Sequence, residues 1–239
     1  QYSAYYVVKG SDMKILLSIC KKHGITFNSL LLSVLSLSSP EIDMAAESTS
    51  EKEKEYENTI SIPLNARKVI FKKEALQELI GLFVTSGKIS TGRINIKNSV
   101  NDMLITVINL AKRINSKVKH RCFGEFQKTV NEIGLLNAAI GDKINNLDVV
   151  IKENPKQKFD YEVSNLGCCN QKSNHAIERL VFNQSFNPRS SNMTISCITG
   201  GSSGDCTLSF MTTNEPELSN WCQRFDKLLL EVLNGLDAK

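Results

Sequence analysis

One stretch of the chain is apolar around nearly its whole circumference when it is drawn as a helix. Thr26 is a typical N-cap residue, and residues 27–38 after it are rich in apolar side chains. These side chains are Leu30, Leu31, Leu32, Val34, Leu35 and Leu37. A helix without a polar face has to be enclosed on all sides, so it requires a layered domain around it. Because Ser33 and Ser36 interrupt the stretch and it is too short to cross a membrane, we expect a central core helix.

The remaining patterns mix helices with strands. Apolar periodicity predicts further helices over residues 12–23, 73–78, 100–118, 123–140 and 218–236. Alternation predicts strands over residues 5–8, 59–65, 80–85, 159–165, 177–186, 193–198 and 206–212, with a turn-rich stretch at 86–93. Ser11 caps the first of these helices and Gly24 ends it, whereas Pro63 indicates a sheet edge or a strand end. The order predicts a layered α/β or α+β domain, in which a mixed sheet is flanked by helices and ends in an antiparallel meander.

Charge is distributed unevenly along the chain. The net charge of +4 comes from 29 Lys and Arg against 25 Asp and Glu, which is too weak to indicate a nucleic-acid partner. Residues 41–58 contain seven acidic residues and two lysines, a local balance of −5, so we expect a mobile acidic loop or a frayed helix there. The rest of the chain then carries +9, which favours an anionic ligand. No composition break divides residues 1–239, so we expect a single domain.

The cysteines and the N-terminus bear on the compartment. The seven cysteines are odd in number and form no CxxC pair, which is typical of reduced thiols in the cytoplasm. No apolar run is long enough for a transmembrane segment, and the first residues lack the pattern of a signal peptide. The chain opens with Gln1 rather than Met, as though it were already inside a fold. We expect a cytoplasmic protein without a transmembrane segment.

Three histidines are the first candidates for acid–base or metal chemistry. His23 closes a predicted helix, where unpaired carbonyls favour a cation, and His120 lies among lysines and an arginine. His175 follows Cys168 and Cys169 at a spacing that is not typical of zinc sites, so we expect no metal site. The chain also lacks the GxSxG, GxxxxGK[ST] and GxGxxG motifs.

Polar residues at predicted strand ends are the next candidates. Residues 200–204 form a hairpin loop, or they cradle a phosphate through their backbone amides. Arg67 follows a predicted strand and either faces a cleft or forms a surface ion pair. Ser164 and Asn165 end a strand just before Gly167, which allows close backbone approach, although the same residues also suit an ordinary turn.

Several short motifs follow one another in a colinear order along nearly the whole chain. They are Asn28-Ser29-Leu30-Leu31, Ile60-Ser61-Ile62-Pro63-Leu64-Asn65-Ala66-Arg67, Gly81-Leu82-Phe83-Val84, Val163-Ser164-Asn165-Leu166-Gly167, and a hairpin from Met193 to Thr212 before a terminal helix. In this order the chain resembles the C-terminal half of alcohol acetyltransferase-like enzymes. These belong to the chloramphenicol-acetyltransferase-like superfamily, together with the condensation domains of peptide synthetases and the polyketide-associated acyltransferases. The resemblance implies the C-terminal lobe of that α/β fold.

The resemblance further implies an acyltransferase of two lobes with a tunnel between them. Acyl-coenzyme A as co-substrate, or a carrier arm, enters from one side, and a small alcohol or amine acceptor enters from the other. In the family, a histidine of an H-x-x-x-D motif in the N-terminal lobe takes the proton of the acceptor, which then attacks the thioester carbonyl.

None of the three histidines fits that motif. Four positions after His23, His120 and His175 stand Phe27, Gly124 and Arg179. The resemblance therefore implies a catalytic histidine on a missing N-terminal lobe, and no catalytic residue or activity in this chain alone. That lobe is missing, cleaved or on another polypeptide.

The resemblance also implies where ligands bind. The substrate- and cofactor-binding residues that it implies are Arg67, Ser164, Asn165, Gly167, Thr199, Ser202 and Ser203. Ser164 and Asn165 lie near the reaction centre, Arg67 holds the wall of the cleft, and residues 199–204 bridge to the other lobe. The basic remainder of the chain suits the phosphates of coenzyme A, which is not covalently bound.

Two other interpretations remain open. A degenerate relative could keep the fold and a cleft without the chemistry, as a non-catalytic module that binds a carrier protein or another partner. A structural protein with a chance match to these short motifs is the third interpretation. Acceptor specificity depends on the shape of a pocket that both lobes form, so the sequence does not predict the acceptor.

Overall fold

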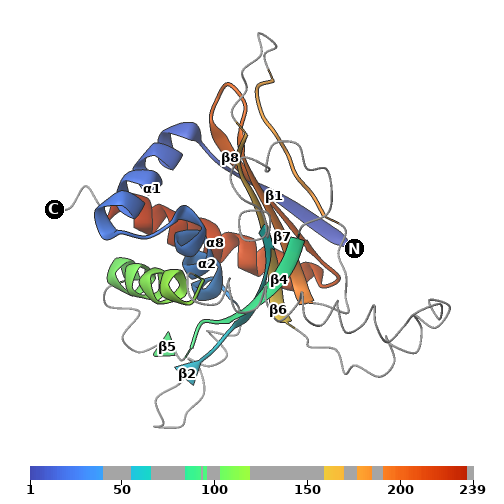
Figure 1. Cartoon of the computed structure of the whole chain (residues 1–239). Coiled ribbons are helices and arrows are strands. Elements are labelled where there is room, and N and C mark those ends of the chain that lie inside the picture. The colour runs from blue at the N-terminus through green and yellow to red at the C-terminus, as the bar shows by residue number, and fades with distance from the viewer. Residues whose placement is uncertain are drawn as a thin grey trace, which may run out of the picture.

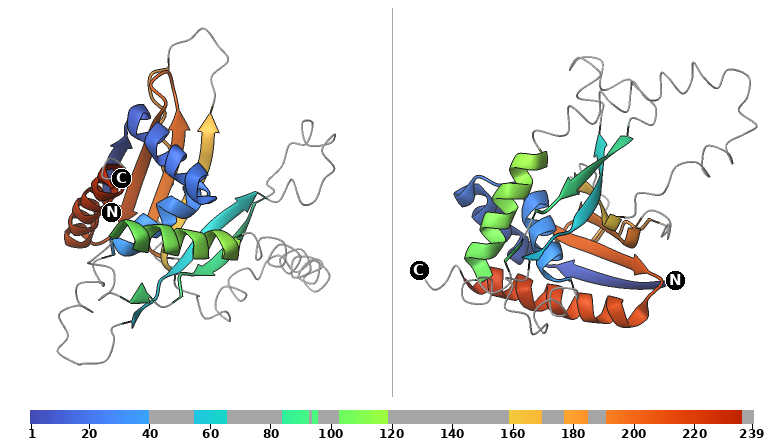
Figure 2. Two further views of the ribbon diagram at one scale, coloured as in Figure 1. Left: turned by 90° about the vertical axis from the view of Figure 1, so that its left-hand side faces the viewer. Right: turned by 90° about the horizontal axis from the view of Figure 1, so that it is seen from below.

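The computed structural model describes residues 1–39, 55–65, 84–92, 94–95, 103–118, 159–169, 177–184 and 191–235. Its centre is a mixed six-stranded sheet with the strand order β1-β8-β7-β6-β3-β4. These strands are β1 (Tyr2–Val8), β3 (Thr59–Asn65), β4 (Val84–Ser90), β6 (Phe159–Cys169), β7 (Ser191–Gly200) and β8 (Asp205–Thr212). The helices are α1 (Gly10–His23), α2 (Phe27–Leu37), a helix over residues 103–118, and α8 (Glu215–Asn234). The helices gather on one side of the sheet (Figures 1 and 2), so the predicted mixed α/β layers are confirmed.

The sheet combines parallel and antiparallel pairs. β6 pairs in parallel with both of its neighbours, β7 and β3, whereas the β1–β8, β7–β8 and β3–β4 pairs are antiparallel. The predicted hairpin between β7 and β8 is therefore confirmed, but the predicted meander is wrong for the parallel β6–β7 pair. β3 pairs with β6 only at Ile60 and Ser61, so Pro63 lies where β3 has β4 as its sole partner. The proline thus occupies the part of an internal strand that needs the fewest ladder hydrogen bonds.

A second, two-stranded sheet joins β2 (Glu55–Tyr56) to β5 (Ile94–Asn95). β2 falls in the segment 41–58 that we expected to be a mobile acidic loop, so that expectation is wrong for its last residues. Asn58 is buried and donates a hydrogen bond from Nδ2 to the carbonyl of Ser36 at 3.2 Å. This bond holds the end of the segment against α2, and the rest of the segment lies outside the described residues.

The apolar stretch forms α2, and it is the buried centre of the helical layer, as predicted. All residues over 29–37 are buried, and Thr26 Oγ1 caps the helix by accepting a backbone N–H at 3.2 Å. The serines within the helix also have partners. Ser33 Oγ donates to the carbonyl of Val107 at 2.8 Å, and Ser36 Oγ donates to the carbonyl one turn earlier at 2.7 Å. Because an unpaired buried hydroxyl costs free energy, these bonds allow polar residues in a helix with no exposed face.

The terminal helix α8 fastens the first strand to the last one. Asn214 caps it, since its Oδ1 accepts the N–H of Glu217 at 3.3 Å. The Phe225 ring meets the rings of Tyr6 in β1 and Phe210 in β8 edge to face, at centroid distances of 5.2 and 5.7 Å. Such aromatic contacts stabilise the core beyond the apolar area that they bury.

The other predicted helices have mixed outcomes. The helix over residues 103–118 confirms the prediction over 100–118, and Gly24 ends α1 in the left-handed conformation, with a φ of 66°. The helices predicted over 73–78 and 123–140 lie outside the described residues.

Two predicted boundaries are wrong. Residues 86–90, which we expected to be turn-rich, belong to β4, because pairing with β3 along its whole length outweighs their local preference. α1 begins before Ser11: its N-cap is Lys9, and its first N–H, from Gly10, donates to Asp205 Oδ1 at 2.9 Å. The acceptor for this helix end comes from β8, which no local pattern shows.

Residues 177–184 do not form the strand that alternation predicted over 177–186. Several of their hydrogen bonds go to side chains of the sheet instead: Thr207 Oγ1 donates to the carbonyl of Leu180 at 2.7 Å, and Ser209 Oγ donates to Asn183 Oδ1 at 2.8 Å. Thr207 and Ser209 alternate with residues that face the helices. The segment therefore lies over the opposite face of the sheet and contributes no rung to its ladder.

Candidate functional site

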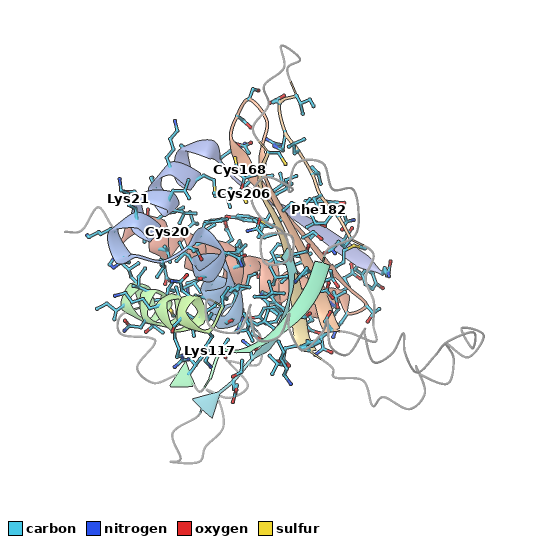
Figure 3. All side chains as sticks on the ribbon, in the orientation of Figure 1. Cys20, Lys21, Lys117, Cys168, Phe182 and Cys206 are labelled. Carbon is cyan, nitrogen blue, oxygen red and sulfur yellow. The ribbon has the colours of Figure 1, made fainter. Side chains whose placement is uncertain are left out.

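The parallel strands β6 and β7 end side by side, and this end of the sheet gathers most of the predicted site residues. Asn165 pairs with Cys197, and after a bulge Cys168 pairs with Thr199. Residues 165–169 and 199–204 therefore lie together, and we call them the β6–β7 end. Thr199 also pairs with Cys206 of β8, so Cys168 and Cys206, both labelled in Figure 3, lie on either side of Thr199 at this end of the sheet. Ligands of sheets with parallel strands commonly bind beyond the carboxyl ends of those strands.

Asn165 links this end of the sheet to the helical layer. Its Nδ2 donates to Asn28 Oδ1 in the first turn of α2 at 3.3 Å, and its Oδ1 accepts the N–H of Gly167 at 2.8 Å. A side-chain amide has two donor hydrogens and one acceptor oxygen, so these bonds leave one Nδ2 hydrogen for another partner. Asn165 therefore positions the end of β6 against α2. The motif that contains Asn28 thus contacts the motif that contains Asn165, although the two asparagines are 137 residues apart in the sequence.

The start of α2 is tied to the helix over residues 103–118 by a second set of hydrogen bonds. Ser29 Oγ lies 2.7 Å from Thr26 Oγ1 and donates to Asn115 Oδ1 at 3.2 Å. Ser29 and Asn115 are both buried. A buried polar pair of this kind fixes the register of two helices, because a shift leaves its atoms without partners.

Gly167 gives the β6–β7 end its shape. Its φ is +78°, in the left-handed region that favours glycine, and it falls in the register shift between Asn165 and Cys168. The bulge exposes Leu166, which is 54% exposed, together with the thiols of Cys168 and Cys169. This end of the sheet thus presents an apolar side chain and two thiols to the surroundings.

Ser164 is not brought together with Asn165. Neighbouring residues of a strand point to opposite faces, and Ser164 pairs with Ser196, whose Oγ accepts the N–H of Gln184 at 3.1 Å. Ser164 is buried, at 6% exposure, on the face away from the helices. The two predicted reaction-centre residues therefore lie on different sides of the sheet.

The turn over residues 201–204 packs closely against residues 177–179. Ser202 N–H donates to the carbonyl of Ile177 at 2.9 Å, and Ser203 Oγ donates to the carbonyl of Glu178 at 3.0 Å. A Cβ on Gly201 would lie 2.2 Å from that Glu178 oxygen. These contacts favour the hairpin turn over the phosphate cradle, because the amide of Ser202 already has an acceptor.

Asp205 joins three segments beside this turn. Its Oδ1 accepts the N–H of Gly10, and its Oδ2 accepts Nε and an Nη hydrogen of Arg179 at 3.2 and 3.0 Å. Burial alone would raise the pKa of Asp205, but the bonds from Gly10, Arg179 and Ser203 together hold that pKa below its usual value. The turn, α1 and the segment over 177–184 are therefore fastened by one carboxylate.

A pocket of about 300 Å³ lies away from the β6–β7 end, between α1, the helix over 103–118 and the end of α8. The residues that line it are polar or basic (Lys22, His23, Asn109 and Lys112) and apolar (Leu104, Ile105 and Ile108), together with Gly235. We call it the basic pocket. Burial lowers the pKa of His23, and the charges of Lys112 and Lys22 lower it further. The sequence pattern predicts His23 at a helix end, but it gives no sign of the pocket, which requires the packing of three helices.

Some predicted site residues cannot be placed. Arg67, His120 and His175 lie outside the described residues. In the part of the chain that the structure describes, no three His, Cys, Asp or Glu side chains come together as metal ligands. None of the described helices has the length and apolar character needed to cross a membrane.

Comparison with known structures identifies the class of fold. The chain is similar to the epimerization domain from the third module of tyrocidine synthetase B, at 14% identity and a TM-score of 0.63, covering 100% of this chain and 49% of that chain. It is also similar to TRI3 trichothecene 15-O-acetyltransferase from Fusarium sporotrichioides, at 13% identity and a TM-score of 0.62, covering 97% and 47%. PapA2 acyl transferase matches at 12% identity and a TM-score of 0.55, covering 97% and 44%. The fold is that of condensation domains and acyltransferases.

The family follows from the sequence itself. The family model of alcohol acetyltransferase matches residues 2–233, and the chain belongs to this family. No curated protein matches the chain. The chain spans about half the length of the solved structures that it resembles.

Proposed function

We propose that this chain is one lobe of a coenzyme A-dependent acyltransferase, which transfers an acyl group from acyl-coenzyme A to an alcohol or amine. Membership in the alcohol acetyltransferase family supports the reaction class. The observation that carries the proposal is the coverage, since nearly the whole chain aligns with 49% or less of each acyltransferase-like or condensation-like chain described above. A lobe of this kind would work with a second lobe.

The missing general base supports the same proposal. None of the three histidines has an aspartate four positions later, so the H-x-x-x-D motif would come from the other lobe. In the proposed reaction that histidine takes the proton of the acceptor hydroxyl or amine, and the acceptor forms a bond to the thioester carbonyl carbon. The C–S bond then breaks, and the thiolate of coenzyme A leaves and takes up the proton.

This lobe would contribute the β6–β7 end to the wall of the shared tunnel. Asn165 acts there as a positioning residue, because its amide fixes the bulge at Gly167 against α2. Leu166, which is more than half exposed, supplies apolar surface for a substrate or for the other lobe. The roles of Thr199, Ser202, Ser203 and Arg67 in binding coenzyme A remain predictions.

The proposal can be tested on the native protein. A tag placed after Lys239 at the native gene retrieves the polypeptide with any partner, and its mass is compared with the 26.6 kDa of this chain. The purified protein is mixed with acetyl-coenzyme A and a panel of primary alcohols and amines, and release of the free thiol is followed. We expect acyl transfer by a protein that contains an H-x-x-x-D lobe, and none by residues 1–239 alone.

Matched variants test the positioning role of Asn165. Asn165→Ala should lower kcat/KM by about tenfold or more, because a displaced site wall loses the reactive geometry. Asn220→Ala removes the same group from an exposed position of α8 and should leave kcat/KM unchanged. The proposal fails if the native protein transfers no acyl group to any acceptor, which would instead favour a non-catalytic binding module. It also fails if residues 1–239 alone are active.

A further inference from the structure

We infer that the basic pocket binds a small amphiphilic anion, namely one carboxylate on a short apolar tail. The pocket is separate from the β6–β7 end, and its ligand would not take part in acyl transfer. Three features of the pocket support the inference: its size, its mixture of basic and apolar lining side chains, and its local charge.

The side chains that line the pocket are of two kinds, basic and apolar. Lys22 and Lys112 come from different helices, and both contribute to the lining. The charges of both lysines lower the pKa of His23, so all three basic groups act on the same space. Within the described residues, neither of these lysines nor His23 pairs with a carboxylate. Ile108, one turn before Lys112 on the same helix, is buried at 5% exposure and lines the pocket together with Leu104 and Ile105.

The local charge matches a single carboxylate. α1 ends at His23 and α8 ends beside Gly235, and each helix C-terminus contributes about −0.5 charge. Lys22 and Lys112 contribute two positive charges, and the first turn of the helix over 103–118, which lines the pocket at Leu104 and Ile105, adds about +0.5. A positive charge of about +1.5 therefore remains when His23 is neutral. A monoanion neutralises most of this charge, and its tail covers the apolar side chains, which a phosphate ion would leave uncovered.

The volume sets the length of the tail. A pocket of about 300 Å³ is at the lower end of the range for small-molecule sites. At roughly 30 Å³ for each water-sized group, it accepts about ten non-hydrogen atoms. Octanoate has this size, with a carboxylate for the lysines and an apolar tail for the isoleucines.

Calorimetric titration with octanoate tests the inference on the whole chain. 1-Octanol serves as the probe without charge, and inorganic phosphate serves as the probe without a tail. We expect octanoate to bind at least about tenfold more tightly than either, because only octanoate makes both a charge-assisted contact and an apolar contact.

Charge reversal locates the site. Lys112→Glu should weaken octanoate binding by about tenfold or more, since it replaces an attractive charge by a repulsive one. Lys21→Glu is the control, because Lys21, which is labelled on α1 in Figure 3, is an exposed neighbour of Lys22 and is not among the lining residues. Lys112 and Lys21 are both exposed, so neither substitution disturbs the core. Lys22→Gln provides a second variant in case charge reversal prevents folding.

Three results would overturn the inference. The first is the absence of octanoate binding, and the second is equal binding of octanoate and 1-octanol or of octanoate and phosphate. The third is an equal effect of Lys112→Glu and Lys21→Glu. None of these measurements depends on acyl transfer, so they separate this inference from the proposed function.

Discussion

Removing the carboxylate of Asp205 should destabilise the protein more than removing any exposed carboxylate of α1. Asp205 is 3% exposed, and it accepts hydrogen bonds from Gly10 at the start of α1 and from Arg179 in the segment over 177–184. α1 has no side-chain cap of its own, because its N-cap residue is Lys9. Asp205→Ala therefore removes a helix cap and an ion pair together.

The magnitude follows from these two contacts. Loss of a cap costs about 1 kcal/mol. The Arg179 side chain is 37% exposed, so its pair with Asp205 is partly screened and contributes about 1 kcal/mol. The free energy of unfolding should fall by about 2 kcal/mol, which for a protein of this size lowers Tm by roughly 4–8 °C.

Urea unfolding followed by fluorescence provides the assay. Trp221 is the only tryptophan and is 2% exposed, so its emission reports on unfolding. Asp12→Ala is the control: Asp12 also lies in the first turn of α1, but its bond is an exposed contact with Ser11, and its loss should cost about 0.5 kcal/mol.

The pH dependence gives an independent check of the same reasoning. The folded protein lowers the pKa of Asp205, so the carboxylate stabilises the fold at pH values above its ordinary pKa. This stabilisation is lost as the pH falls through the lowered pKa of the folded state. The difference between the wild type and Asp205→Ala should therefore shrink in acid. A loss below about 0.5 kcal/mol at neutral pH, or an undiminished difference in acid, would refute the reasoning.

Two further predictions concern the β6–β7 end and its surroundings. An alkylating reagent at mildly alkaline pH should label the exposed Cys168 quickly and should label Cys197 only when the protein unfolds. Cys197 should react slowly because the contact with Cys206 and burial raise the pKa of its thiol. Mass spectrometry of the digested protein measures both labelling rates. Fast labelling of Cys197 in the folded protein would contradict its burial. Gly167→Ala should cost about 1–2 kcal/mol in urea unfolding, since φ is +78° and the added Cβ meets no atom within 4 Å. Gly24→Ala, at φ +66° with equal space, is its control and should cost the same; a much larger loss at Gly167 would show a steric contact there.

Local signals were sufficient for much of the helical layer. Thr26 and Asn214 cap α2 and α8 as their residue types predict, and Gly24 ends α1 in the left-handed conformation. The hairpin between β7 and β8 was equally predictable from its glycines. These features depend on residues within a few positions of one another, so the sequence pattern contains the whole cause.

The errors occurred where a distant segment decides the local structure. Residues 86–90 form a strand because β3 pairs with them, and residues 177–184 remain outside the ladder because they bond to side chains on the face of the sheet. The cap of α1 comes from Asp205, which is 195 residues away from Gly10. No propensity of the local residues indicates such partners.

The candidate site was predictable in part, and one error could have been avoided. The colinear motifs directed attention to Asn28, Asn165 and Gly167, which the structure brings into contact. Ser164 was assigned to the same site, although neighbouring residues of a strand point to opposite faces. The alternation that predicted β6 should have separated Ser164 from Asn165. The basic pocket could not be predicted, because its walls come from three helices that are far apart in the sequence.

The hydrogen bonds at the β6–β7 end bear on what this chain would contribute to the proposed reaction. The side-chain amide of Asn165 is hydrogen-bonded to Asn28 and Gly167, and the backbone N–H of Ser202 donates to the carbonyl of Ile177. Polar groups that are already bonded within the chain hold a surface in shape, whereas proton transfer requires a titratable group that can approach the acceptor. The described residues of this end therefore suit a rigid wall of the substrate tunnel. In the proposed reaction this wall would come from this chain, and the histidine would come from the other lobe.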